Sequence, residues 1–158
     1  MNEIGSLLII YGIPASGKSF FVNKIEKSLT DNFEKTFFFD IDDLEYYLRE
    51  FDYDENLSEN LKFNFLNLMK IQNKISFHDI LSLINKNYEA IISNNKYYAS
   101  SYDKNIWIYS RAMAYELIEF LLKQKILIVC EDTFLLSSMR KKFKSLCQRF
   151  IFLFFTNP

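Results

Sequence analysis

Residues 12–19 read Gly12-Ile13-Pro14-Ala15-Ser16-Gly17-Lys18-Ser19, and this segment fits the pattern G-x-x-x-x-G-K-[ST]. It follows the continuous apolar run Leu7–Tyr11 and precedes Lys18–Leu29, in which apolar residues recur at helical spacing. Glycines let such a loop curl until successive backbone N–H groups point into one anion-sized hollow. The start of the helix adds the positive end of its dipole. The sequence therefore predicts a phosphate-binding loop between a buried strand and a helix.

The last two residues of this motif carry its chemistry. Lys18 supplies a flexible ammonium group for the β- and γ-phosphates of a nucleotide, and the Ser19 hydroxyl completes a Mg²⁺ shell. We therefore predict that the chain binds ATP and Mg²⁺ through residues 12–19, although the motif alone leaves ATP and GTP open.

Apolar runs and helical periodicity alternate along the rest of the chain. Further strands are expected at Thr36–Phe39, Ile126–Cys130 and Phe150–Phe155, and helices at Leu44–Phe51, Ser58–Ile75, Phe77–Ile92, Ile106–Leu122 and Leu135–Cys147. This alternation predicts an α/β fold of the P-loop NTPase or kinase-like kind, a three-layer sandwich with a mostly parallel sheet. No linker divides the chain, so we expect one domain over residues 1–158, with a helical insert at 52–103.

Composition limits the kinds of function that the chain can have. Its 158 residues are 49% apolar and 25% charged, as in an ordinary globular domain and unlike a disordered tail. A net charge of −1 gives no general case for binding nucleic acid or an acidic membrane surface. Two cysteines make no disulfide framework, and neither a signal peptide nor an apolar run of about 18 residues is present. We therefore expect a cytoplasmic protein.

Acidic residues follow two of the expected strands. Glu131 and Asp132 end one of them, where a carboxylate reaches Mg²⁺ through water, although acids also cap strands and open helices. Asp40, Asp42 and Asp43 follow another, where a carboxylate can accept the proton of an attacking hydroxyl. Residues 40–59 hold nine acids against one arginine, so some of these aspartates are a solvated face or helix caps. Composition does not choose among the three.

Only four arginines occur in the chain, and three of them are candidates for stabilising transition-state charge: Arg111, Arg140 and Arg149. The alternative for Arg140 is a solvated helix face, since it belongs to a basic run. His78 lacks other metal-ligating residues nearby in the sequence, so it is interpreted as a surface or helix-start residue.

Three segments together resemble one family. They are G-I-P-A-S-G-K-S, F-D-I-D-D-L and I-V-C-E-D-T-F-L-L-S-S-M-R, and in this order they are similar to L-seryl-tRNA(Sec) kinase, which phosphorylates the serine carried on selenocysteine tRNA. The chain departs from the family pattern at Glu131, where the family has Asp, and at Leu135-Leu136, where it has an aromatic pair. A related P-loop factor that works with the Elongator complex in tRNA modification matches Ser137-Ser138-Met139-Arg140 less well.

The resemblance implies an ATP- and Mg²⁺-dependent kinase acting on Ser-tRNA(Sec), with no membrane partner. It places catalytic roles on Lys18, Asp43 and Arg140, and Mg²⁺ contacts on Ser19, Asp42, Glu131 and Asp132. In the family a lid region follows the strand equivalent to Phe150–Phe155, whereas this sequence stops at Pro158, so we expect a core without its lid. The alternatives are an Elongator-associated type of factor and an inactive nucleotide-binding fragment.

Overall fold

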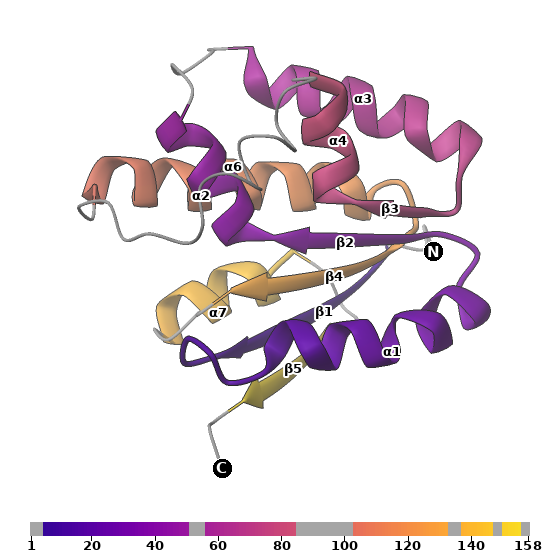
Figure 1. Ribbon diagram of the computed structural model, residues 1–158, viewed down its shortest axis with the longest axis horizontal. Helices are drawn as coiled ribbons and strands as arrows, with labels where there is room; N and C mark the ends of the chain where they lie inside the picture. The colour runs from indigo at the N-terminus through magenta and orange to yellow at the C-terminus, as the bar shows by residue number, and fades with distance from the viewer. Residues whose placement is uncertain (1–4, 51–55, 85–102, 133–136, 147–149, 156–158) are drawn as a thin grey trace.

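A five-stranded parallel sheet lies at the centre of the computed structural model, with the strand order β3-β2-β4-β1-β5 (Figure 1). The structure describes residues 5–50, 56–84, 103–132, 137–146 and 150–155. The strands are β1 (Ser6–Gly12), β2 (Thr36–Asp40), β3 (Lys74–Ser76), β4 (Leu127–Asp132) and β5 (Phe150–Phe155). The predicted mostly parallel sheet is thereby confirmed.

Strand β1 lies inside the sheet, between β4 and β5. Leu7 of β1 is in register with Ile128 on one side and with Phe150 on the other. Its side chains alternate between the two faces of the sheet, as strand geometry requires, and both faces are buried. A fully buried interior strand explains the uninterrupted apolar run in the sequence.

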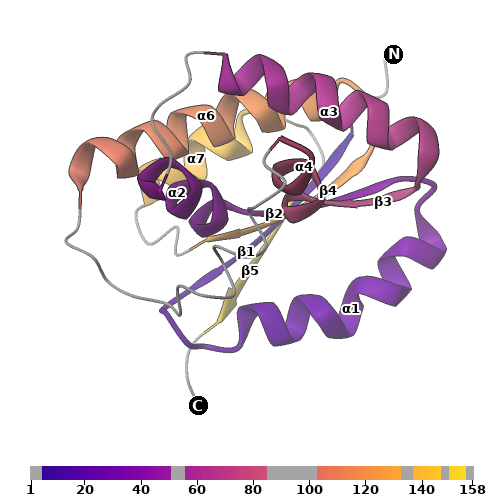
Figure 2. The ribbon, with the colours of Figure 1, turned by 45° about the horizontal axis from the view of Figure 1, so that its top comes forward.

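Helices cover both faces of the sheet, which makes the three layers that we predicted. Helix α1 (Lys18–Asn32) packs on one face through Val22, Phe21, Ile25 and Leu29. The opposite face packs against the remaining helices, as Figure 2 shows. These are α2 (Ile41–Glu50), α3 (Leu57–Ile71), α4 (Phe77–Ile84), α6 (Lys104–Leu122) and α7 (Ser137–Lys144).

The direction of two connections explains this distribution. From β1 to β2 the chain moves toward one edge of the sheet, and from β4 to β5 it moves toward the other. Since parallel crossovers are right-handed, their helices α1 and α7 must lie on opposite faces. All five strands also point the same way, so the loop after β1 and the start of α2 meet at the carboxyl edge, at the left in Figure 1.

The structure corrects the expected helix over Ser58–Ile75. Helix α3 ends at Ile71, and residues 74–76 form β3, which pairs with β2 at the edge of the sheet. Helix α4 then begins with reciprocal bonds, in which the Ser76 and Asp79 side chains each accept from the other's backbone N–H, at 3.1 and 2.8 Å. This is a capping box, and it separates two helices that share similar periodicity. The stretch expected as a helical insert therefore contributes a strand to the main sheet.

Helix α2 also starts earlier than predicted, at Ile41 instead of Leu44. The Asp40 side chain accepts a hydrogen bond from the backbone N–H of Asp42, at 2.9 Å, which is the geometry of an N-terminal cap. The chain therefore passes from β2 directly into the helix, and Asp42 and Asp43 lie in its first turn.

Gly5 is required by close packing at the amino edge of the sheet. A Cβ atom at this position would lie 2.4 Å from the carbonyl oxygen of Ile126, and the Gly5 N–H donates to the Leu122 carbonyl. Among the residues that the structure describes, no helix is long and apolar enough to cross a membrane.

Candidate active site

The predicted phosphate-binding loop joins the carboxyl end of β1 to the start of α1 (Figure 1). Two residues of the loop have left-handed backbone, Ala15 with φ 59° and Gly17 with φ 84°. Glycine occupies this region without strain, whereas alanine does so rarely. The Ser16 N–H donates to the Ile13 carbonyl at 3.3 Å and closes a turn. The loop therefore curls at the positive end of α1, as anion binding requires.

Lys18 and Ser19 begin α1 and extend toward the loop and the sheet respectively. The Lys18 Nζ donates to the carbonyl oxygens of Gly12 and Ile13, at 3.2 and 3.0 Å. The Ser19 Oγ donates to Glu131 Oε2 at 3.0 Å, across 112 positions of sequence. The motif lysine thus lies over its own loop, and the motif serine contacts the strand predicted to supply a carboxylate.

The structure separates Glu131 from its neighbour Asp132. Successive side chains of a strand point to opposite faces, so Glu131 contacts Ser19 while Asp132 points into the layer of α6. There its Oδ1 accepts from Arg111 Nη2 at 2.9 Å, and its side chain is fully buried. Of the two predicted Mg²⁺ acids on β4, only Glu131 therefore contacts a residue of the phosphate-binding motif.

Asp40, Asp42 and Asp43 lie at the same edge of the sheet as the loop. Asp40 ends β2, which pairs with β4 so that Asp40 is in register with Glu131. Its side chain caps α2, as one of the alternative interpretations proposed. Asp43 is partly buried, and Asp42 is exposed. The structure therefore brings all three aspartates near the loop, and it gives Asp40 a structural task.

The pKa values at this edge are raised because several carboxylates share a poorly hydrated region. Burial raises the pKa of Asp43, the charge of His78 opposes this rise, and the charge of Asp42 adds to it, so that the resulting pKa is about 6. Burial, and then the charges of Asp43, Asp42 and Glu131, hold the pKa of Asp40 well above its usual value. Burial also raises the pKa of Glu131. A carboxylate with a pKa near 6 is well matched to accepting a proton near neutral pH.

Arg140 reaches this edge from α7. Its guanidinium lies over the Tyr11 ring, 4.8 Å from the ring centroid, and Tyr11 is the residue before the phosphate-binding loop. The structure thus places Arg140 next to the loop. Arg149, the other C-terminal arginine proposed from the sequence, lies outside the described residues.

Arg111, the third arginine candidate, is held by acidic side chains. Its guanidinium contacts Glu45 at 2.8 Å and Asp132 at 2.9 Å, and it stacks on the Trp107 ring at 4.4 Å. Sequence reasoning missed this network, because its partners lie 66 and 21 positions away and no motif connects them. His78 lies in the first turn of α4, in agreement with its interpretation as a helix-start residue, and the Ser76–Asp79 capping box spans its position. Its electrostatic effect on Asp43 was not predicted from the sequence.

Oxygen atoms suited to Mg²⁺ lie beside the loop. Mg²⁺ prefers oxygen ligands and is usually bound by one or two protein groups together with nucleotide phosphates and water. The Ser19 hydroxyl and the Glu131 carboxylate provide such a pair. Within the described part of the chain, no group of three or more His, Cys, Asp or Glu side chains forms a closed metal cage. The residues therefore fit a metal that arrives with a nucleotide.

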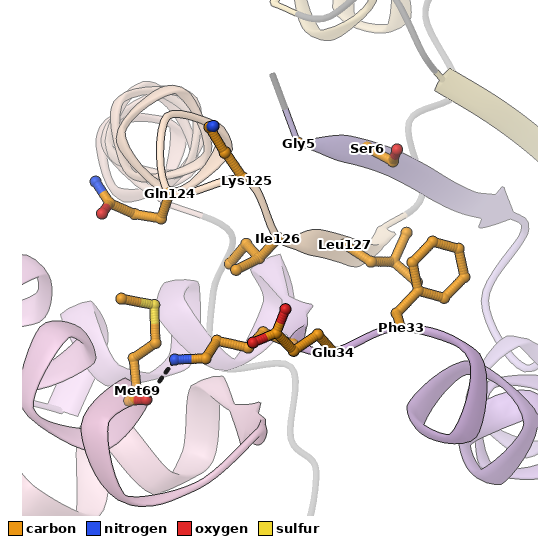
Figure 3. A pocket seen from close by; sticks show the side chains of 10 residues that line it. Gly5, Ser6, Phe33, Glu34, Met69, Gln124, Lys125, Ile126 and Leu127 are labelled. Carbon is orange, nitrogen blue, oxygen red and sulfur yellow. Dashed lines mark hydrogen bonds between the residues drawn. The ribbon is translucent and has the colours of Figure 1, made fainter. Parts of the chain in front are cut away.

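A separate cavity of about 410 Å³ lies at the opposite, amino edge of the sheet (Figure 3). It lies beside Gly5 and Ser6 at the start of β1 and Ile126 and Leu127 at the start of β4. Lys35 there donates to the Met69 carbonyl at 2.9 Å, which ties the start of β2 to α3. The full length of the strands separates this cavity from the phosphate-binding loop.

Two solved structures resemble the chain across nearly its whole length. No family model matches the sequence, and no curated protein matches it. A cysteine-to-alanine mutant of the APS kinase CysC from Mycobacterium tuberculosis superposes with a TM-score of 0.55 at 12% identity, covering 98% of this chain and 80% of that one. The chain has a P-loop kinase fold. The structure of the protein APE1195 superposes with a TM-score of 0.54 at 9% identity. The match covers 99% of this chain and 65% of the APE1195 chain.

Proposed function

We propose that this chain is an ATP- and Mg²⁺-dependent phosphotransferase that acts on a hydroxyl group. One observation carries the proposal. The Ser19–Glu131 contact of 3.0 Å supports a metal-binding role for this pair beside the phosphate-binding loop, and Asp43, with a pKa of about 6, lies at the same edge of the sheet. Phosphoryl transfer needs these parts: a phosphate cradle, a metal site and a group that orients the attacking hydroxyl.

Each side chain then has a task that its position supports. The loop amides and the Lys18 ammonium bind the phosphates, after Lys18 exchanges its bonds to the loop carbonyls for bonds to phosphate oxygens. Ser19 and Glu131 would hold Mg²⁺, which neutralises phosphate charge when bound. Asp43 accepts the proton of the acceptor hydroxyl.

Three further residues predicted from the sequence have different positions relative to the site. Arg140, over Tyr11, is placed to offset charge that develops on the transferred phosphoryl group. Asp42 is exposed in the first turn of α2 and remains available as a further oxygen donor around the metal. Asp132 acts through its ion pair with Arg111 and supports Glu131 from behind the strand.

We infer the acceptor from the sequence resemblance to L-seryl-tRNA(Sec) kinase, which rests on residues 12–19, 39–44 and 128–140. The proposed reaction transfers the γ-phosphoryl group of ATP to the seryl hydroxyl of Ser-tRNA(Sec). The hydroxyl oxygen forms a bond to phosphorus, the bond to the ADP oxygen breaks, and the hydroxyl proton passes to Asp43. The products are ADP and phosphoseryl-tRNA.

The test measures transfer of labelled γ-phosphate to Ser-tRNA(Sec), uncharged tRNA and free serine. We expect transfer to the seryl group only. Lys18→Ala should lower the rate by at least about 10²–10³-fold, as removal of one preorganised donor does. Lys27→Ala, on the exposed side of the same helix, is the matched control. ATP hydrolysis stimulated by any tRNA, without seryl transfer, would instead favour the Elongator-associated type of factor. Full activity of Lys18→Ala would disprove the assigned site.

A further inference from the structure

A chain of four charged side chains, one buried and three partly buried, connects α2, α6 and the end of β4. Arg111 of α6 donates to Glu45 Oε2 at 2.8 Å and to Asp132 Oδ1 at 2.9 Å, and Glu45 Oε1 accepts from Arg49 at 2.5 Å. The side chains of Arg111, Glu45 and Asp132 are 10%, 13% and 0% exposed. Two arginines and two carboxylates make the network neutral overall, which permits its burial.

The two acids of this network lie next to residues of the proposed site. Glu45 is in α2, less than one turn after Asp42 and Asp43, and Asp132 directly follows Glu131. Arg111 therefore bridges the helix that carries the proposed base and the strand that carries the proposed metal-binding carboxylate. It also donates to Ser110 Oγ at 3.0 Å and stacks on Trp107, so its own orientation is fixed.

Apolar packing alone would hold α2 less precisely. Ile41, Leu44 and Leu48 are buried on the α6 side of the sheet, but apolar contacts are not directional and allow a helix to rotate or slide. Charge-assisted hydrogen bonds require defined distances and angles. The planar guanidinium can bind two carboxylates at once in a fixed geometry, which a lysine ammonium does not reproduce.

We propose that Arg111 is a positioning residue that holds α2 against the end of β4, and so sets the distance between Asp43 and the nucleotide site. This inference rests on the proposed function. Arg111 acts through Glu45 and Asp132, which engage its guanidinium, and it does not contact the reacting groups. A displacement of about 1 Å at a reacting group can cost about 10²-fold in rate.

The test compares three variants of the full chain. Glu45→Gln weakens the connection to α2 while keeping the size of the side chain. Arg111→Met removes the bridge and fills a similar volume. Lys62→Met is the control, because Lys62 of α3 contacts Glu116 of α6 at 2.5 Å, so this change also breaks an ion pair to α6 but does not involve α2.

We measure kcat, KM for ATP and amide hydrogen exchange of residues 41–50, at a temperature where each variant is folded. Glu45→Gln and Arg111→Met should lower kcat about 10–10²-fold and leave KM for ATP within about twofold, because the phosphate-binding loop belongs to other elements. Exchange in α2 should increase in both variants and stay unchanged in Lys62→Met. The double variant Glu45→Gln/Arg111→Met should have the same kcat as Arg111→Met alone, because both changes break the same connection between α2 and β4.

Two results would overturn the inference. One is an unchanged kcat in the folded Glu45→Gln and Arg111→Met proteins. The other is equal loss of ATP affinity and turnover in all three variants, which would indicate general destabilisation. If the wild-type chain transfers no phosphate to any acceptor, the proposed function fails, and the exchange measurement still decides the anchoring. Equal α2 exchange in Arg111→Met and Lys62→Met would then disprove it.

Discussion

Replacing Asp43 by asparagine should stabilise the protein while it removes phosphoryl transfer. Burial raises the pKa of Asp43 to about 6 from its ordinary 3.8, so the folded protein binds this proton more tightly than the unfolded chain does. Above pH 6 the carboxylate is charged in both states, and the folded state carries the cost of keeping that charge in a poorly hydrated site. Asparagine has nearly the same shape and no charge to bury.

The size of this effect follows from the two pKa values. The interval between 3.8 and about 6 corresponds to about 3 kcal/mol at pH values above 6. Residual contact with water reduces the gain to roughly 1–3 kcal/mol, and the attraction to His78 is already included in the pKa of about 6. Since Asp43 also raises the pKa of Asp40, the substitution relieves part of a second unfavourable charge. A chain of this size should gain a few degrees in melting temperature, about 2–4 °C per kcal/mol.

Denaturant unfolding at pH 8, 6 and 4, without nucleotide or Mg²⁺, measures the effect. The wild-type protein should lose stability from this group as pH rises from about 4 to about 6, and the advantage of Asp43→Asn should therefore be full at pH 8 and nearly absent at pH 4. Glu34→Gln, at an exposed position between α1 and β2, is the control for removing one negative charge. A variant that is less stable than wild type at pH 8, or a difference independent of pH, would refute the reasoning.

Two further substitutions test the metal-binding pair and the close packing at the amino edge. Glu131→Gln should raise the Mg²⁺ concentration needed for tight ATP binding about 10–100-fold, because it removes the charge that faces Ser19; an unchanged Mg²⁺ midpoint in a binding titration would contradict this role. Gly5→Ala should lower the free energy of unfolding by about 1–3 kcal/mol, because the new methyl group would meet the Ile126 carbonyl at 2.4 Å. ATP affinity should not change in this variant, and denaturant unfolding that matches wild type would show that the strand ends move apart easily.

The main strands were predictable because a strand that is buried on both faces has an uninterrupted run of apolar residues. The runs at Leu7–Tyr11 and Ile126–Cys130 correspond to β1 and β4 within two residues at each end. The phosphate-binding loop was equally plain, since its spacing of glycine, lysine and serine is dictated by the anion that it surrounds. The likeness to the solved APS kinase structure confirms the predicted fold.

Short and long-range features were not predictable in the same way. Strand β3 has three residues, too few for a period of two to be distinguished from the helical pattern around it. The choice among Asp40, Asp42 and Asp43 depended on where α2 begins, and a local hydrogen bond from Asp42 to Asp40 decides that. The Arg111 network depends on contacts between distant elements, which a single sequence does not record.

The two ends of the phosphate-binding loop are held with very different firmness. Its start continues β1, which is hydrogen-bonded on both sides, whereas its end continues α1, in which Val22 is the buried side chain and Phe20 is 65% exposed. A bound phosphate would therefore contact a rigid segment on the β1 side of the loop and a more mobile segment on the α1 side. When ligands of different size bind, we expect α1 to move and the sheet to keep its position. Nucleotide binding should therefore reduce local opening mainly in α1, the single helix that covers its face of the sheet.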